Sequence, residues 1–205
     1  MRLLMTGFEP FGQRKFNASW EAVKRARIPA GTEVRKVRLP VTWAGAPRML
    51  LEQMADFEPD AVLLCGLAAD SDRIRVERVG INLCGSHPDN DGLYPQGPDR
   101  PGECPILPGG EAAYFSTFSH TAILAALQQE HIPAALSYTA GTYICNLVLY
   151  TALRQTASEG KNRAVGFIHV PEATETSFPP RPGALPLSQL SRALELTASV
   201  LASDR

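Results

Sequence analysis

The chain has 205 residues, of which 44% are hydrophobic and 20% are charged, and its formal net charge is −1. These values are typical of a globular protein and argue against a disordered or fibrous one. No Lys/Arg stripe is present, which argues against nucleic-acid binding because such binding depends on neutralising phosphates. The length fits one domain, and we predict a single domain over residues 1–205.

No segment of the sequence has the pattern of a targeting signal or a membrane span. The apolar stretch at the N-terminus is too short for a signal peptide, and the other apolar runs are far below the ~20 residues that a span requires. The four cysteines form no C-x-x-C pair, which disfavours a zinc site. We therefore expect a cytoplasmic protein with free thiols and no membrane partner.

The first half of the chain alternates short apolar runs with helical patterns. Strands are predicted over residues 2–5, 34–39 and 61–65. Helices are predicted after a cap at Asn17 or Ser19 and over residues 43–56. Polar and apolar residues alternate over 73–83, but the phase slips next to Glu77 and Arg78, which predicts a bend or bulge there.

A long loop separates this half from the next elements. Between Gly85 and Gly110, 12 of 26 positions are Gly or Pro, which leaves no regular helix or strand. We expect the loop to be mobile and to lie over the mouth of the site, where it would bring a donor such as His87 or Arg100 toward the oxyanion. A surface loop without a role is the alternative.

The second half continues the alternation of strands and helices. Strands are predicted over residues 134–138 and 164–170, and helices around 123–127, after Cys145, and over 187–201. The histidines that flank the first of these helices, His120 and His131, are expected to be solvated. The fold class predicted is a three-layer α/β/α single domain with a largely parallel, mixed sheet.

Cys145 is the candidate nucleophile because a Gly-containing turn follows a strand and leads into a helix at this point. A helix N-terminus favours the thiolate, and its free N–H groups can hold an oxyanion. Taken alone, Cys145 is better explained as a buried small hydrophobe, so its position and its neighbours must decide.

His169 and Glu77 are the other candidates. His169 lies near the carboxyl end of an apolar strand, where ligands of open α/β sheets bind, although a hydrogen-bonded core histidine is the alternative. Glu77 has Arg75 and Arg78 close in sequence, so a surface ion pair is its simplest interpretation.

Six segments in fixed order form a recognisable pattern. They are TGFEPFG at 6–12 with Asn17, ERV at 77–79 with Asn82, PDN at 88–90 with Gly92, YFST at 114–117, SYTAGTYICN at 137–146 and GFIHVP at 166–171. Together they resemble the type I pyroglutamyl peptidases, also called pyrrolidone carboxyl peptidases, which are cysteine exopeptidases. The resemblance implies hydrolysis of the amide bond after an N-terminal pyroglutamyl residue through a thioester acyl-enzyme.

The resemblance also implies residue roles. Cys145 would be the nucleophile, His169 its base and Glu77 the residue that orients the base. No metal or organic cofactor is implied, and the partners are peptides with an N-terminal pyroglutamyl residue. Homodimers and homotetramers are common in the family. The lactam pocket is predicted to be formed by Phe8, Phe11, Asn17, Tyr143 and Ile144.

The chain departs from the resemblance in two places. Gly66-Leu67-Ala68 stands where many members have Gly-Gln-Ala, and Gly85-Ser86-His87 stands where members commonly carry an arginine that assists the oxyanion. The second departure supports one alternative, a non-catalytic binding module on the same scaffold. A nucleoside phosphorylase-like enzyme is another alternative, although no basic phosphate cluster supports it.

Overall fold

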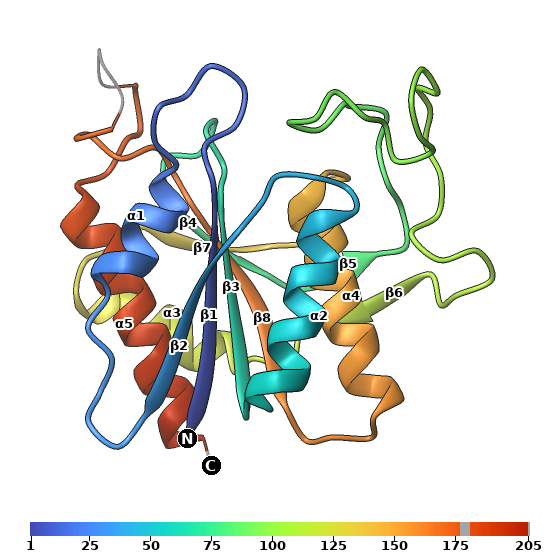
Figure 1. Ribbon diagram of the computed structural model, residues 1–205. Coiled ribbons are helices and arrows are strands. Elements are labelled where there is room, and N and C mark those ends of the chain that lie inside the picture. The colour runs from blue at the N-terminus through green and yellow to red at the C-terminus, as the bar shows by residue number, and fades with distance from the viewer. Residues whose placement is uncertain (177–180, 205) are drawn as a thin grey trace.

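The computed structural model of the chain describes residues 1–176 and 181–204. Figure 1 shows a central sheet with helices packed on both of its faces. The strands are β1 (Arg2–Phe8), β2 (Glu33–Leu39), β3 (Ala61–Leu67), β4 (Ile74–Glu77), β5 (Val79–Ile81), β6 (Ala113–Phe115), β7 (Ala134–Ser137) and β8 (Ala164–Val170). The helices are α1 (Ala18–Arg25), α2 (Gly45–Phe57), α3 (His120–Gln129), α4 (Ile144–Ser158) and α5 (Leu187–Ser203).

The main sheet has six strands in the order β2-β1-β3-β8-β4-β7. All neighbours are parallel except β8 and β4, which pair antiparallel. The sheet is therefore mostly parallel and mixed, and the predicted fold class is confirmed. A second sheet of two strands, β5 and β6, was not predicted, because its strands are only three residues long.

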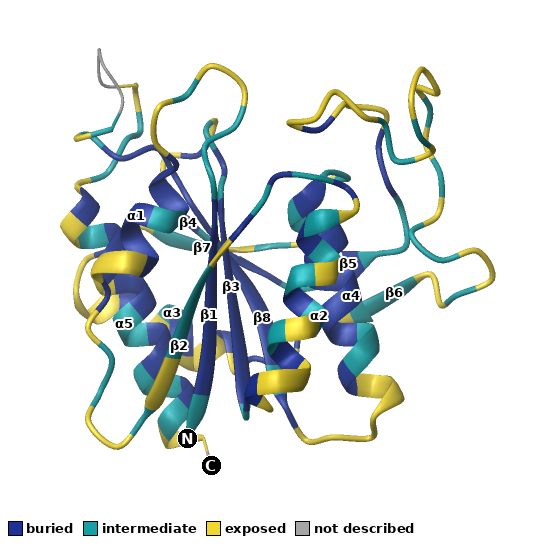
Figure 2. Ribbon diagram, in the orientation of Figure 1, coloured by how far each residue is buried: buried dark blue, intermediate teal, exposed yellow. Residues whose placement is uncertain are grey.

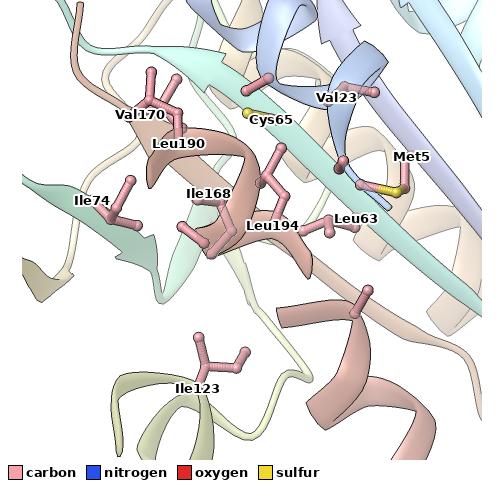
Figure 3. Packing of buried hydrophobic residues seen from close by; sticks show 14 of the residues in the cluster. Met5, Val23, Leu63, Cys65, Ile74, Ile123, Ile168, Val170, Leu190 and Leu194 are labelled. Carbon is pink, nitrogen blue, oxygen red and sulfur yellow. The ribbon is translucent and has the colours of Figure 1, made fainter. Parts of the chain in front are cut away.

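Each face of the main sheet packs against its own helices because side chains alternate between the faces along a strand. Leu3 and Met5 of β1 belong to the apolar cluster that includes α1, α3 and α5, whereas Leu4 belongs to the cluster that includes α2 and α4. The central strands are consequently buried over most of their length (Figure 2). Figure 3 shows the first cluster, where Ile168 of β8 and Leu194 of α5 are both buried.

The predicted helix after Asn17 is confirmed, and Asn17 is its N-cap. Its Oδ1 accepts hydrogen bonds from the backbone N–H of Ser19 at 3.1 Å and from the Ser19 hydroxyl at 2.8 Å. The Ser19 hydroxyl in turn accepts from the backbone N–H of Phe8 at 3.1 Å. These bonds tie the start of α1 to the end of β1 and so fix both ends of the loop between them.

The irregularity predicted near Glu77 is not a bulge, because the chain passes from the main sheet to the two-stranded sheet at this point. Arg78 lies between β4 and β5, donates its backbone N–H to the Ser137 carbonyl at 2.8 Å and accepts from the Ser116 N–H at 2.9 Å. The change in side-chain phase therefore marks the end of β4 in the main sheet. Glu77 is left as the last residue of that strand.

Candidate active site

The antiparallel pairing of β4 with β8 determines where Glu77 and His169 lie. In this register Arg75 is opposite His169 and Glu77 is opposite Phe167. Residues opposite one another in an antiparallel pair point to the same face, and a long side chain can reach its diagonal neighbour. Glu77 and His169 are diagonal neighbours, and both face the side of the sheet that α4 covers.

Glu77 and His169 form a buried hydrogen-bonded pair. The imidazole Nδ1–H donates to Glu77 Oε1 at 2.8 Å. Glu77 is completely buried and His169 is 6% exposed. Arg75 instead approaches Asp70, and Arg78 donates to His120 at 3.2 Å. The surface ion-pair interpretation of Glu77 is therefore wrong.

The pKa of His169 reflects three competing effects. Burial would lower the pKa, because it disfavours the charged imidazolium. The charge and hydrogen bond of Cys145, followed by the hydrogen bond and charge of Glu77, outweigh burial and raise the pKa to about 9. An imidazolium at position 169 is thus stable at neutral pH when Cys145 is a thiolate.

Cys145 lies in the first turn of α4, as predicted. Its side chain lies close enough to His169 to raise the pKa of the imidazole. Because Nδ1 of the imidazole is bonded to Glu77, Nε2 is the atom that is available to the thiol. The first backbone hydrogen bond of α4 runs from the Leu147 N–H to the Tyr143 carbonyl at 3.1 Å. The N–H groups of the residues in between belong to the unpaired first turn of the helix.

Asn146 fixes the start of α4 and was not recognised from the sequence. Its side-chain amide donates to the carbonyls of Ile81 and Leu83 at 2.9 Å each, and its Oδ1 accepts from the Ile81 N–H at 2.9 Å. Asn146 is completely buried. These three bonds attach the helix turn that carries Cys145 to the chain segment that follows Glu77.

Two of the other cysteines, Cys65 and Cys84, are poor nucleophiles because their thiols are buried. Burial, and then the proximity of Cys145, raises the pKa of Cys65 well above its usual value. Burial, and then Cys104, raises the pKa of Cys84 to about 12. Because the thiolate is the reactive form, Cys65 and Cys84 are nearly unreactive at neutral pH.

A small cavity of about 60 Å³ opens beside Cys145. It is lined by Phe8, Phe11, Asn17, Val41, Leu67, Tyr143, Ile144 and Cys145. All five residues predicted to bind substrate therefore border one cavity next to the thiol. Val41 and Leu67 were not predicted, because nothing in their local sequence distinguishes them from core residues.

Part of the long loop is fastened to this site. The Tyr143 hydroxyl donates to the Pro88 carbonyl at 3.0 Å, and the Trp43 N–H donates to Asp89 at 2.9 Å. Asn90 donates its side-chain amide to the Pro10 carbonyl at 2.9 Å and its backbone N–H to the Val41 carbonyl at 3.0 Å. The Pro88–Asn90 segment is thus attached to residues at and next to the cavity. The roles expected of His87 and Arg100 stay predictions.

His120 is buried, and the prediction that it is solvated is wrong. It is 4% exposed, and its Nε2 lies 3.3 Å from the Glu77 carbonyl oxygen. Burial lowers the pKa of His120. The bond to the Glu77 carbonyl has the opposite effect, and the nearby charge of Arg78 lowers the pKa further. A neutral imidazole can accept from Arg78 at Nδ1 and donate to Glu77 at Nε2. His131, by contrast, is exposed as expected.

Two features that the described residues lack bear on the kind of site. Within residues 1–176 and 181–204, no group of three or more His, Cys, Asp or Glu side chains is arranged to hold a metal ion. No helix in the same described part of the chain has the length and apolarity needed to cross a bilayer.

The fold and the buried Glu–His pair next to a cysteine define the class of a cysteine hydrolase with a Cys-His-Glu arrangement. The family model described as pyroglutamyl peptidase matches residues 1–203, and the chain belongs to this family. The predicted family, enzyme class and reaction are thereby confirmed.

Named relatives agree with this assignment. A pyrrolidone-carboxylate peptidase of Thermococcus kodakarensis is 41% identical over 209 residues, which cover 100% of this chain and 97% of the relative. The crystal structure of the Bacillus amyloliquefaciens pyroglutamyl peptidase I has a TM-score of 0.89 and 34% identity, over 98% of this chain and 97% of that one. A mutant pyrrolidone carboxyl peptidase from Pyrococcus furiosus has a TM-score of 0.91 and 31% identity, over 100% and 99% of the two chains.

Gly66 leaves the space that the Cys145 thiol occupies, which generates a first prediction. A Cβ at position 66 would lie 2.8 Å from Cys145 Sγ and 2.6 Å from Phe167 Cζ. We expect Gly66→Ala to lower kcat by about 10²-fold, because a displacement of roughly 1 Å at a reacting atom has this effect.

Steady-state kinetics of the purified variant would measure this effect. Gly166→Ala is the matched control, because its Cβ would crowd the Phe118 ring at 2.4 Å on the opposite face of the sheet. We expect that control to lose stability but to keep the kcat of its folded fraction. A Gly66→Ala enzyme with wild-type kcat would contradict the assignment of this space to the thiol.

Proposed function

We propose that Cys145, His169 and Glu77 carry out the hydrolysis of pyroglutamyl peptides. The Cys145 thiolate attacks the carbonyl carbon of the pyroglutamyl residue, and the tetrahedral intermediate collapses to a thioester as the amine leaves. The His169 imidazolium gives its proton to that amine and then takes a proton from the water that attacks the thioester. The observation that carries the proposal is the 2.8 Å hydrogen bond between Glu77 and His169, in a site where Cys145 lies close enough to raise the pKa of the imidazole.

Glu77 has the role of a positioning residue in this mechanism. Its bond to Nδ1 sets the imidazole tautomer, so that Nε2 faces the thiol. Since the carboxylate is completely buried, its negative charge also stabilises the imidazolium that forms opposite the thiolate.

The first turn of α4 is the proposed oxyanion site. Backbone N–H groups at a helix N-terminus stabilise negative charge, and the turn is held rigid by the three hydrogen bonds of Asn146. The mechanism therefore has a source of oxyanion stabilisation at a site where the chain lacks the arginine expected near Gly85.

The cavity beside Cys145 suits a small neutral ring. Phe8 and Phe11 contribute apolar surface to it, as do Val41, Leu67 and Ile144. The polar atoms of Asn17 are engaged with Glu9 and Ser19, so Asn17 shapes the cavity as well as bordering it. A lactam, which carries no ammonium group, loses little hydration on entering such a space, whereas a free amino terminus loses much more.

The proposed partners are peptides with an N-terminal pyroglutamyl residue, and the proposed compartment is the cytoplasm. Four free cysteines support a reducing compartment. The proposed assembly is a homodimer or homotetramer, for which the exposed side chains of Phe115 and Tyr138 offer apolar surface.

The substrate specificity gives the most direct test of the activity. We expect release of a fluorescent amine from a pyroglutamyl amide, with rates at least about 10²-fold lower for the matching glutamyl and prolyl amides. The glutamyl amide would bring charges into a nearly apolar cavity. The prolyl amide lacks the lactam carbonyl and carries an ammonium group. Equal turnover of all three amides would contradict a lactam-specific site.

Substitution of single cysteines tests the nucleophile. We expect Cys145→Ala to abolish hydrolysis, and Cys65→Ala, Cys84→Ala and Cys104→Ala to retain most of it, because Cys145 is the cysteine whose side chain acts on the imidazole of the Glu77–His169 pair. Peptide mapping after limiting alkylation of the wild-type enzyme should show Cys145 modified first. Preferential modification of another cysteine with activity intact would overturn the assignment.

The role of Glu77 is tested by separating turnover from binding. We expect Glu77→Gln to lower kcat by about 10²- to 10⁴-fold with little change in KM, because it weakens an interaction that matters for the reaction and not for the bound lactam. Arg75→Gln is the matched control, since Arg75 lies on the same strand but interacts with Asp70 and Ser71. An unchanged kcat in Glu77→Gln would remove Glu77 from the mechanism.

A further inference from the structure

Phe11 is a wall of the substrate cavity that belongs to no helix or strand and is only partly buried against the apolar cluster on the α2 and α4 side of the sheet. It lies in the loop between β1 and α1, followed by Gly12 with a positive φ of 60°. A loop side chain that must be ordered on binding reduces affinity, because its conformational entropy is lost at that step. Contacts that order the Phe11 ring before the ligand arrives, in addition to its apolar packing, therefore favour binding.

Arg14 provides one such contact. Its guanidinium carbon lies 4.6 Å from the centroid of the Phe11 ring, within the range of a cation–π interaction. Arg14 is not among the residues that line the cavity. The guanidinium thus contacts the ring without occupying the space of the ligand.

Glu172 holds Arg14 in this place. The Arg14 Nε–H donates to Glu172 Oε1 at 3.2 Å, and the side chains of Arg14 and Glu172 are 28% and 8% exposed. A carboxylate buried to this degree needs a charged or hydrogen-bonding partner. Glu172 is itself fixed, because its carbonyl accepts from the Leu185 N–H at 3.0 Å.

The position of Glu172 connects the loop that carries Phe11 with the segment that carries His169. It follows His169 by three residues and lies directly beyond the end of β8. The chain of contacts therefore runs from the loop that carries Phe11, through Arg14, to the segment that carries His169.

We propose that Arg14 and Glu172 are positioning residues that hold Phe11 against the lactam ring of the substrate. The inference rests on the proposed function of the cavity. Since the lactam ring is bound alike before and during the reaction, the clamp of Arg14 and Glu172 contributes to binding and not to the chemical step.

The variant that tests the clamp is Arg14→Met, which keeps an unbranched stem but removes the guanidinium. We expect KM for a pyroglutamyl amide of a fluorescent amine to rise about tenfold while kcat stays within about twofold of wild type. Glu172→Gln should raise KM less, because a neutral amide oxygen can still accept from Arg14. The double variant should raise KM no more than Arg14→Met alone, since both changes remove the same interaction.

Arg35→Met is the matched control. Its guanidinium carbon lies 4.5 Å from the Phe57 ring centroid, and it pairs with Asp56 at 2.5 Å, but none of these residues lines the cavity. We expect wild-type KM in this control. The alkylation rate of Cys145 by iodoacetamide, which does not need the lactam cavity, should be unchanged in Arg14→Met and reports that the variant is folded.

The outcomes separate this proposal from the function on which it rests. A wild-type enzyme that fails to hydrolyse the pyroglutamyl amide would overturn the proposed function. A wild-type enzyme that is active, with an Arg14→Met variant that keeps wild-type KM or loses kcat instead, would overturn the clamp alone. An equal rise of KM in Arg35→Met would also overturn it.

If Arg14→Met fails to fold, Arg14→Lys decides in its place. This variant keeps the charge but loses the planar group that stacks on the ring, so it should raise KM.

Discussion

The buried hydrogen bond between Glu77 and His169 is the constraint on which the rest of the site depends. A carboxylate with no solvent exposure is unfavourable unless it is paired, and among the described residues its second oxygen, Oε2, has no hydrogen-bond partner. After the effect of Cys145, which is the larger one, the pairing with Glu77 favours a positive charge on His169 against the effect of burial on the pKa of the imidazole. That charge in turn is the natural partner of a thiolate at Cys145.

The fold produces this pair by reversing one strand in a sheet that is otherwise parallel. Because β4 runs antiparallel to β8, its last residue lies diagonally across from His169 and points to the same face. Helix α4 covers that face and begins at the level of His169, so the first helical turn brings Cys145 to the imidazole. Gly66 on β3, opposite His169 in the register, leaves room for the sulfur.

The sequence was informative where local chemistry decides the structure. Apolar runs bounded by Gly and Pro predicted the main strands, and the turn before Ile144 predicted a helix with Cys145 in its first turn. The likeness of six segments to a known family supplied the roles of Glu77 and His169, which their local sequence could not. Arg75 and Arg78 made Glu77 resemble a surface residue, because only the tertiary structure directs those arginines to other partners.

Contacts between distant segments account for what the sequence did not reveal. The burial of His120 depends on α3 beginning next to Glu77 at the end of β4, and periodicity within α3 does not report it. The mobility expected of the loop stays a prediction, but the sequence did not reveal that Asp89 and Asn90 bond to residues more than forty positions away. The pair of Arg14 and Glu172, which are 158 positions apart, is equally invisible in the sequence.

Titration of His169 by nuclear magnetic resonance tests directly whether the Glu77 carboxylate keeps the imidazole protonated. Enzyme labelled with ¹⁵N-histidine would be titrated as wild type and as Glu77→Gln, with the His169 signal assigned from a His169→Ala sample. We expect the wild-type imidazole to stay protonated until the pH approaches about 9. We expect a lower pKa of His169 in Glu77→Gln, because a neutral amide does not stabilise the imidazolium. A wild-type pKa near the ordinary 6.5, or one that Glu77→Gln leaves unchanged, would contradict it.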